Sequence, residues 1–180
     1  AHRDPLLNHR AQIRRQPVEV EPCRSPEDKG TPFLHKDQFS KGKGTFFAIP
    51  YREPAEVTND EFPFWLTTGR VGFQYHTRTM TGVSPSLQKE AAEGYLEINP
   101  FDAAQLGIDE GEKVYVISRR GKIQIKALLT FNVARNVVFI PFHYVESAAN
   151  VLTNTAFDPV AKIPELKVGA VRVEKMEPQG

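Results

Sequence analysis

Short apolar runs separated by turn residues make up most of the sequence after residue 60. Five or six of these runs have the length and the β-branched or aromatic content of strands. They cover residues 64–70, 94–98, 113–118, 123–129, 137–140 and 170–173. The run 113–118 is almost continuously apolar, which predicts a strand buried on both faces.

The next run, 123–129, alternates between apolar and polar positions. Ile123, Ile125, Ala127 and Leu129 are expected to face the core, with Gln124 and Lys126 facing outward. The pair Arg120-Gly121 separates this run from the preceding one. We therefore expect the two strands to form a hairpin.

One short helix is predicted over residues 100–106. Asn99 can cap its first turn, Pro100 suits its first position, and Asp102 favours its positive end. Gly107 follows as a stop signal. With one or two short helices and no βαβ alternation, the pattern favours a mainly β protein, a small closed barrel rather than a doubly wound sheet.

The first sixty residues have a different texture. They contain seven of the fourteen prolines and few apolar residues, which predicts an extended arm over 1–60 that packs on a partner or a preceding domain. Within this arm we expect a short segment 33–39, a turn at 42–44 and one strand at 45–50. The barrel domain is expected to cover residues 61–177.

Composition limits the possible classes of function. The charges nearly cancel, with 23 Lys and Arg against 22 Asp and Glu, so no broad basic face favours nucleic acid. The single cysteine, Cys23, excludes a disulfide or a thiolate metal cage built from this chain alone. No apolar run approaches a membrane span, which predicts a soluble, cytoplasmic chain, with a periplasmic complex as the alternative. The sequence starts at Ala1, not Met, as an internal segment of a longer protein would.

The candidate chemistry begins where the first predicted strand ends. Thr67-Thr68-Gly69-Arg70 places backbone N–H groups and a guanidinium at one point, as a phosphate or diphosphate requires. The segment 75–82 adds His76, Arg78 and several hydroxyls without core periodicity. Arg70 and Arg78 would pair with the charges of a diphosphate, and Thr68, Thr79 and Thr81 would be neutral donors. An ordinary turn explains the first cluster equally well when it is taken alone.

Nucleotide and catalytic motifs are missing. The sequence has neither GxxxxGKS/T nor GxGxxG, no serine in an elbow motif, and no His/Asp/Glu set with the spacing of metal ligands. His76 and His143 are not assigned to catalysis. Asn150 to Asn154 could bind a polar heterocycle or build a turn, and Lys167 could contact a phosphate or be a solvated lysine.

Seven short motifs, in this order, resemble a known family. They are Leu66-Thr67-Thr68-Gly69-Arg70, His76-Thr77-Arg78-Thr79-Met80-Thr81, Leu96-Glu97-Ile98-Asn99-Pro100-Phe101-Asp102-Ala103, Ser118-Arg119-Arg120-Gly121, Pro141-Phe142-His143, Ala149-Asn150-Val151-Leu152-Thr153 and Pro164-Glu165-Leu166-Lys167. The chain resembles the C-terminal molybdopterin-guanine-dinucleotide-binding domain of the dimethyl-sulfoxide-reductase family, and within it formate dehydrogenase catalytic subunits. The resemblance covers about residues 62–175.

This resemblance implies a six-stranded double-psi β-barrel of the aspartate-decarboxylase-like type. It also implies a bis-molybdopterin guanine dinucleotide cofactor with molybdenum or tungsten. The residues that it places against the cofactor are Thr68, Gly69, Arg70, Val71, His76, Thr77, Arg78, Thr79, Met80, Thr81, His143, Asn150 and Lys167.

The same resemblance implies that this chain is a fragment or subunit of a formate dehydrogenase, with formate and carbon dioxide as the substrate pair. Family members resembling it carry an iron–sulfur cluster and a cysteine or selenocysteine metal ligand, and this sequence matches neither motif. Both are therefore expected on a larger partner polypeptide, and the chain alone is not expected to be catalytic. The alternatives are a nitrate reductase-type member of the same family and a double-psi barrel that acts as a protein-interaction module without a cofactor.

Overall fold

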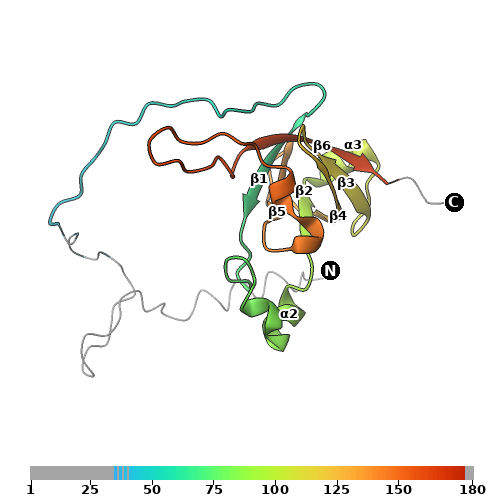
Figure 1. Cartoon of the computed structure of the whole chain (residues 1–180). Coiled ribbons are helices and arrows are strands. Elements are labelled where there is room, and N and C mark those ends of the chain that lie inside the picture. Colours follow the sequence, from blue (N-terminus) through green and yellow to red (C-terminus); the bar gives the residue numbers. More distant parts are fainter. Residues whose placement is uncertain (1–34, 36, 38, 40, 177–180) are drawn as a thin grey trace. The chain divides into compact units, whose positions relative to one another are not determined.

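A computed structural model of the chain describes residues 35, 37, 39 and 41–176. The chain divides into two units, Ala1–Pro50 and Tyr51–Gly180. Cys23 and most of the predicted segment 33–39 lie outside the described residues. The second unit contains the barrel and is drawn in Figure 1.

Six strands close into a barrel in the order β1-β5-β2-β4-β3-β6. Their bounds are β1 Phe64–Gly69, β2 Tyr95–Ile98, β3 Lys113–Ile117, β4 Lys122–Leu129, β5 Val137–Pro141 and β6 Gly169–Lys175. Two pairs, β1 with β5 and β2 with β4, are parallel although the strands are far apart in the sequence. The arrangement is a double-psi β-barrel, as predicted.

The predicted helix is present as α3, Pro100–Leu106. The Asn99 side chain accepts a hydrogen bond from the Phe101 N–H, and Gly107 ends the helix at φ 65°. The remaining elements are α2 Pro85–Glu90 and three 3₁₀ turns, η1 Thr81–Val83, η2 Val145–Ser147 and η3 Ala149–Val151. Helix α2 is not predicted by the sequence, because none of its residues is buried and it carries no apolar periodicity.

The hairpin of β3 and β4 is confirmed by its antiparallel register, with Val116 opposite Ile123. The prediction that β3 is buried on both faces is wrong. Val114 and Val116 point inward, whereas Tyr115 and Ile117 are only half-buried. A barrel wall has an outer face, and here Lys122 lies over the Tyr115 ring at 3.4 Å. Covering by this long side chain explains the aromatic residue at outer position 115.

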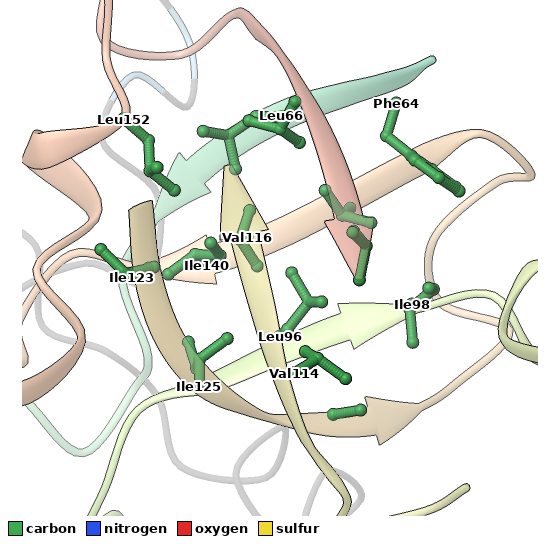
Figure 2. Close-up of a cluster of buried hydrophobic side chains, with 14 of the residues drawn as sticks. Phe64, Leu66, Leu96, Ile98, Val114, Val116, Ile123, Ile125, Ile140 and Leu152 are labelled. Atoms are coloured by element: carbon green, nitrogen blue, oxygen red, sulfur yellow. The ribbon is translucent and has the colours of Figure 1, made fainter. Parts of the chain in front are cut away.

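Alternate residues of the strands fill the barrel interior. Figure 2 shows Leu66, Leu96, Val116 and Ile140 converging from different strands, and Leu152 approaching from outside the sheet. In β4, Ile123, Ile125 and Ala127 are buried and Leu129 is partly buried, as the alternation predicted. Burial of these side chains is the main stabilising contribution in a domain of this size.

The strand predicted at residues 45–50 is wrong. This segment has no regular secondary structure, and Phe46, Phe47 and Ile49 are exposed. A strand needs a paired neighbour, and the described residues offer this segment none. Among helices in the described part of the chain, none is long and apolar enough to cross a membrane.

Residues 55 and 56, assigned to the arm by sequence, are attached to the barrel. Both Glu56 carboxylate oxygens bond the Arg120 guanidinium, and Oε1 also accepts from the Ala170 N–H at 2.7 Å. Arg120 in turn donates to the Leu152 carbonyl at 2.6 Å. Ala55 N–H donates to Glu165 at 3.1 Å. The Glu56 carboxylate thus joins the chain before β1, the β3–β4 turn and the start of β6.

This carboxylate predicts a loss of stability in acid. Burial raises the pKa of Glu56, but hydrogen bonds from Arg120 and Ala170 and the charges of Arg120 and Arg119 together lower it below 4.5. A lowered folded-state pKa means that the unfolded chain binds more protons as the pH falls. The free energy of unfolding should therefore decrease below a pH of about 4.5.

Urea unfolding between about pH 3 and pH 7 measures this dependence. A Glu56→Gln chain should lose less stability over the same acid range. Equal acid sensitivity of the two chains would show that other carboxyl groups dominate.

Candidate functional site

The predicted site residues come together at one end of the barrel because β1 and β5 run parallel. Gly69 lies opposite Pro141 in the register, so the segments that follow both strands leave the barrel side by side. Strand β6 is antiparallel to β1 and begins with Gly169 opposite Leu66. Residues 166–168 therefore lie beside the end of β1. Segments around residues 70, 143 and 167 meet at this end.

Two hydrogen bonds join the end of β1 to the segment before β6. Thr68 is buried, and its hydroxyl donates to the Leu166 carbonyl at 2.7 Å. Lys167 Nζ donates to the Thr68 carbonyl at 2.8 Å. The Thr68 hydroxyl is thus used within the chain, and its contribution to the site is to position Lys167.

Two cations lie near one aromatic ring. The Arg70 guanidinium carbon and Lys167 Nζ are each 5.8 Å from the centroid of the Phe142 ring. Both side chains belong to exposed residues, and neither forms an ion pair with an acid among the described residues. Two unpaired cations beside an aromatic face can bind an anionic group attached to a planar ring.

Gly69 is required by packing. A Cβ at this position would lie 2.5 Å from Cε2 of Phe139. Gly69 also accepts a hydrogen bond from Phe142 N–H at 3.1 Å. The glycine therefore lets Phe139 cover the strand end and places Phe142 next to Arg70. Its backbone conformation is that of an ordinary strand residue, so the close approach is what calls for glycine.

His143 is buried and links two segments. Its Nε2 accepts a hydrogen bond from Val71 N–H at 3.0 Å, and its Nδ1 bonds the His76 carbonyl. An N–H donor at Nε2 and a carbonyl at Nδ1 together assign the proton to Nδ1. With both nitrogens used, His143 fixes the positions of Val71 and His76.

The segment 75–82 exposes part of its polar surface. Met80 and the residues Thr77 and Thr79 are exposed, and the two threonine hydroxyls lie 2.9 Å apart. Thr81 faces inward, accepting from Tyr75 N–H and donating to Gln74 at 2.6 Å. The hydroxyls of Thr77 and Thr79 are hydrogen-bonded to each other and remain exposed, so both oxygens can still accept from a ligand, whereas the hydroxyl of Thr81 holds the loop.

Arg78, whose buried Nε has no hydrogen-bond partner among the described residues, binds within the chain through its two terminal nitrogens. It donates to Gln88 at 2.7 Å and to the Ala92 carbonyl at 3.1 Å, and it forms an ion pair with Glu146. Its guanidinium also lies 4.8 Å from the centroid of the Tyr144 ring. Sequence analysis paired Arg78 with Arg70 as the diphosphate cations. In the structure Arg78 holds the loop and α2 against η2.

We therefore expect Arg78→Ala to loosen residues 75–93. The loop would lose its bonds to Gln88, Ala92 and Glu146, and local opening exposes backbone to protease. Trypsin should cleave after Lys89 at least about tenfold faster than in the unchanged chain. Arg70→Ala is the matched control, because its guanidinium makes no such bonds, and its cleavage rate should stay unchanged.

Asn150 lies in η3 at the same end of the barrel. The residue is exposed, and its carbonyl accepts a hydrogen bond from the Thr153 hydroxyl at 3.0 Å. Asn154, in the same polar cluster, bonds the Val168 carbonyl, Glu165 and Ala156 N–H. Asn154 therefore builds the turn, while the side chain of Asn150 is the one presented to solvent.

Several residues that shape this end were not predicted as part of the site. Phe142 belongs to a matched motif but carries no polar group that would indicate a site. The sequence places Arg120 in a turn and Glu56 in the arm. Each acquires its role through a neighbour more than 60 positions away. Among the described residues no group of three His, Cys, Asp or Glu could hold a metal ion.

The exposed cations beside Phe142, at one end of the barrel, fit an anionic ligand. Residues 64–170 match the family described as Molydopterin dinucleotide binding domain. This chain belongs to that family.

Comparison with curated proteins identifies close relatives. The chain is 51% identical over 157 residues to the F420-dependent formate dehydrogenase subunit alpha of Methanocaldococcus jannaschii, covering 86% of the chain and 23% of that protein. It is 44% identical over 154 residues to a nitrate reductase of Symbiobacterium thermophilum, covering 83% and 20%. Formate dehydrogenase H of Escherichia coli is 36% identical over 163 residues, covering 88% and 23%. The chain thus spans about a quarter of the length of these relatives.

Among solved structures, acetylene hydratase from Pelobacter acetylenicus has the same fold. The match has a TM-score of 0.61 and 16% identity, and covers 71% of this chain and 21% of that one. This likeness supports the barrel assignment. The relatives make the chain a molybdopterin-binding domain homologous to formate dehydrogenase alpha subunits, with the nitrate reductase at lower identity.

Proposed function

We propose that this chain holds a molybdopterin guanine dinucleotide in a formate dehydrogenase that interconverts formate and carbon dioxide. The proposal rests on two cations, Arg70 and Lys167, that lie beside Phe142 and have no acidic partner among the described residues. A dinucleotide offers both a diphosphate and planar rings, which fits this pair. The identity to formate dehydrogenase alpha subunits supports the choice of formate over nitrate.

The residues toward the cofactor have two kinds of role in this proposal. Arg70 and Lys167 bind phosphate, and the hydroxyls of Thr77 and Thr79, the Asn150 side chain and Met80 line the surface beside them. Thr68, Gly69, Val71, His76, Arg78, Thr81 and His143 complete the set and keep these groups in position. The diphosphate pair predicted from sequence, Arg70 with Arg78, is replaced by Arg70 with Lys167.

The bound group would supply a molybdenum or tungsten centre that exchanges electrons with the substrate, and a protein's share in such chemistry is to bind and orient it. The iron–sulfur cluster and the residue that ligates the metal belong, in our proposal, to a larger polypeptide. The chain is then the C-terminal portion or a separate subunit of the enzyme. The arm that packs on its other parts is residues 1–50, because residues 55 and 56 are bonded to the barrel.

The cofactor can be tested directly. Acid treatment of the intact, metal-replete complex containing this chain should release about one or two guanine nucleotides per chain, since both cofactor halves carry one. Absence of the nucleotide would contradict the proposed function and favour the alternative of a protein-interaction module without a cofactor. Formate oxidation by the same complex, with no reduction of nitrate, would separate the two enzyme activities.

A further inference from the structure

The segment between η3 and β6 contains a loop with its own internal structure. Phe157 and Pro164 form an antiparallel bridge that closes the loop. Asp158 N–H donates to the Ile163 carbonyl at 2.9 Å, and Lys162 N–H donates to the Asp158 carbonyl at 3.0 Å. The Asp158 carboxylate also accepts from the N–H groups of residues 160 and 161. These bonds close the loop on itself.

This ordered loop presents apolar side chains to solvent. Phe157 is 62% exposed, Val160 88% and Ile163 66%. Figure 1 shows the loop, in orange-red before β6, extending away from the barrel. An internally bonded loop with exposed apolar residues is pre-organised to bury them against another surface at low entropic cost.

The base of the loop is joined to the candidate cofactor site. Leu166, at its end, accepts the hydrogen bond from the Thr68 hydroxyl, and the next residue, Lys167, bonds the Thr68 carbonyl. A polypeptide that covers the loop would therefore lie next to Arg70 and Phe142. The position of the loop beside the candidate site therefore favours a covering polypeptide that also contacts the cofactor.

We propose that residues 157–163 form a docking loop for the larger polypeptide that completes the cofactor site. This inference rests on the proposed function. The relatives are about four times longer than the segment that they share with this chain. The remaining three quarters of such a polypeptide could supply the surface that covers the loop. The docking loop carries only two charged side chains, Asp158 and Lys162, and the Asp158 carboxylate is satisfied within the loop. The surface that it fits is therefore apolar.

The test labels single introduced thiols in the complete complex, in a chain whose native cysteine is removed by Cys23→Ser. Val160→Cys places a thiol in the docking loop, and Phe131→Cys places one at a residue that is 72% exposed. Phe131 is a suitable control because it follows β4 near Ile98, at the end of β2 that pairs with the start of β5. It therefore lies at the opposite end of the barrel from Gly69 and Pro141.

A maleimide should label the thiol of the Val160→Cys chain at least about tenfold more slowly than that of the Phe131→Cys chain in the complex. The two thiols should react equally fast once urea separates the chains. Equal rates in the complex would overturn the proposal. So would cross-linking of two copies of the Val160→Cys chain by a bis-maleimide, because the loop would then face a second copy.

A second variant tests the contact itself. Phe157→Asp should lower the amount of larger polypeptide retained with this chain at least about tenfold, whereas Phe131→Asp should not. Guanine nucleotide content is measured in parallel. A protected thiol at position 160 without nucleotide would refute the proposed function alone, and a freely labelled thiol there with nucleotide bound would refute the docking loop alone.

Discussion

Replacing Arg70 and Lys167 together by Gln should cost the assembled complex most of its bound dinucleotide. Each cation makes a charge-assisted contact worth about 1.5–3 kcal/mol, so the pair contributes about 3–6 kcal/mol, or 10²- to 10⁴-fold in affinity. Both side chains are exposed and lie beside Phe142, outside the barrel interior. The barrel itself should therefore remain folded.

The measurement is guanine nucleotide released per complex. The control is Arg172→Gln with Lys175→Gln, which removes the same charge from β6, where Arg172 pairs with Glu174 and Lys175 with Glu112. The control should retain full occupancy. Full occupancy in the Arg70 and Lys167 variant would remove the basis for the proposed phosphate site.

Replacing Glu56 by Ala should lower the free energy of unfolding much more than removing an exposed carboxylate does. The Glu56 side chain is only 9% exposed, and its removal leaves the Arg120 guanidinium and the Ala170 N–H without their partner. Breaking a buried pair from one side costs about 3–5 kcal/mol. Because the Arg120 side chain is 25% exposed, solvent compensates part of this, and we expect about 2–3 kcal/mol.

Urea unfolding of the chain measures this loss, with Glu61→Ala as the matched control. Glu61 lies five residues further along, has a side chain that is 66% exposed, and pairs with Arg172 at 3.4 Å. Its removal should cost at most about 1 kcal/mol. If the two variants lose equal stability, the Glu56 carboxylate does not hold the segment before β1 on the barrel.

Elements that depend on neighbouring residues could be predicted from the sequence, whereas those that depend on distant residues could not. Helix α3 was predicted with its bounds because Asn99, Pro100 and Gly107 act on their immediate neighbours. Helix α2 was missed because it buries nothing. The strand predicted at 45–50 was wrong because aromatic content alone cannot supply a pairing partner.

The candidate site shows the same difference between what the sequence indicates and what it does not. The sequence indicated the segments that form it, since Thr, Gly, Arg and His without core periodicity stood out after the first strand. It could not separate residues that face a ligand from residues that hold the loop. Arg78 and Arg70 look alike in the sequence, yet the terminal nitrogens of Arg78 bind Gln88, Ala92 and Glu146, while the Arg70 guanidinium lies over Phe142.

By itself the sequence determined that this protein is a small β-barrel with a capped short helix and a polar segment after its first strand, because apolar periodicity, capping and turn chemistry are local. Only the tertiary structure decided which residues form the cofactor surface. The parallel pairing of β1 with β5, and the antiparallel pairing of β6 with β1, bring Arg70, Phe142 and Lys167 together. Such contacts depend on strand order in the closed barrel, which no local pattern specifies.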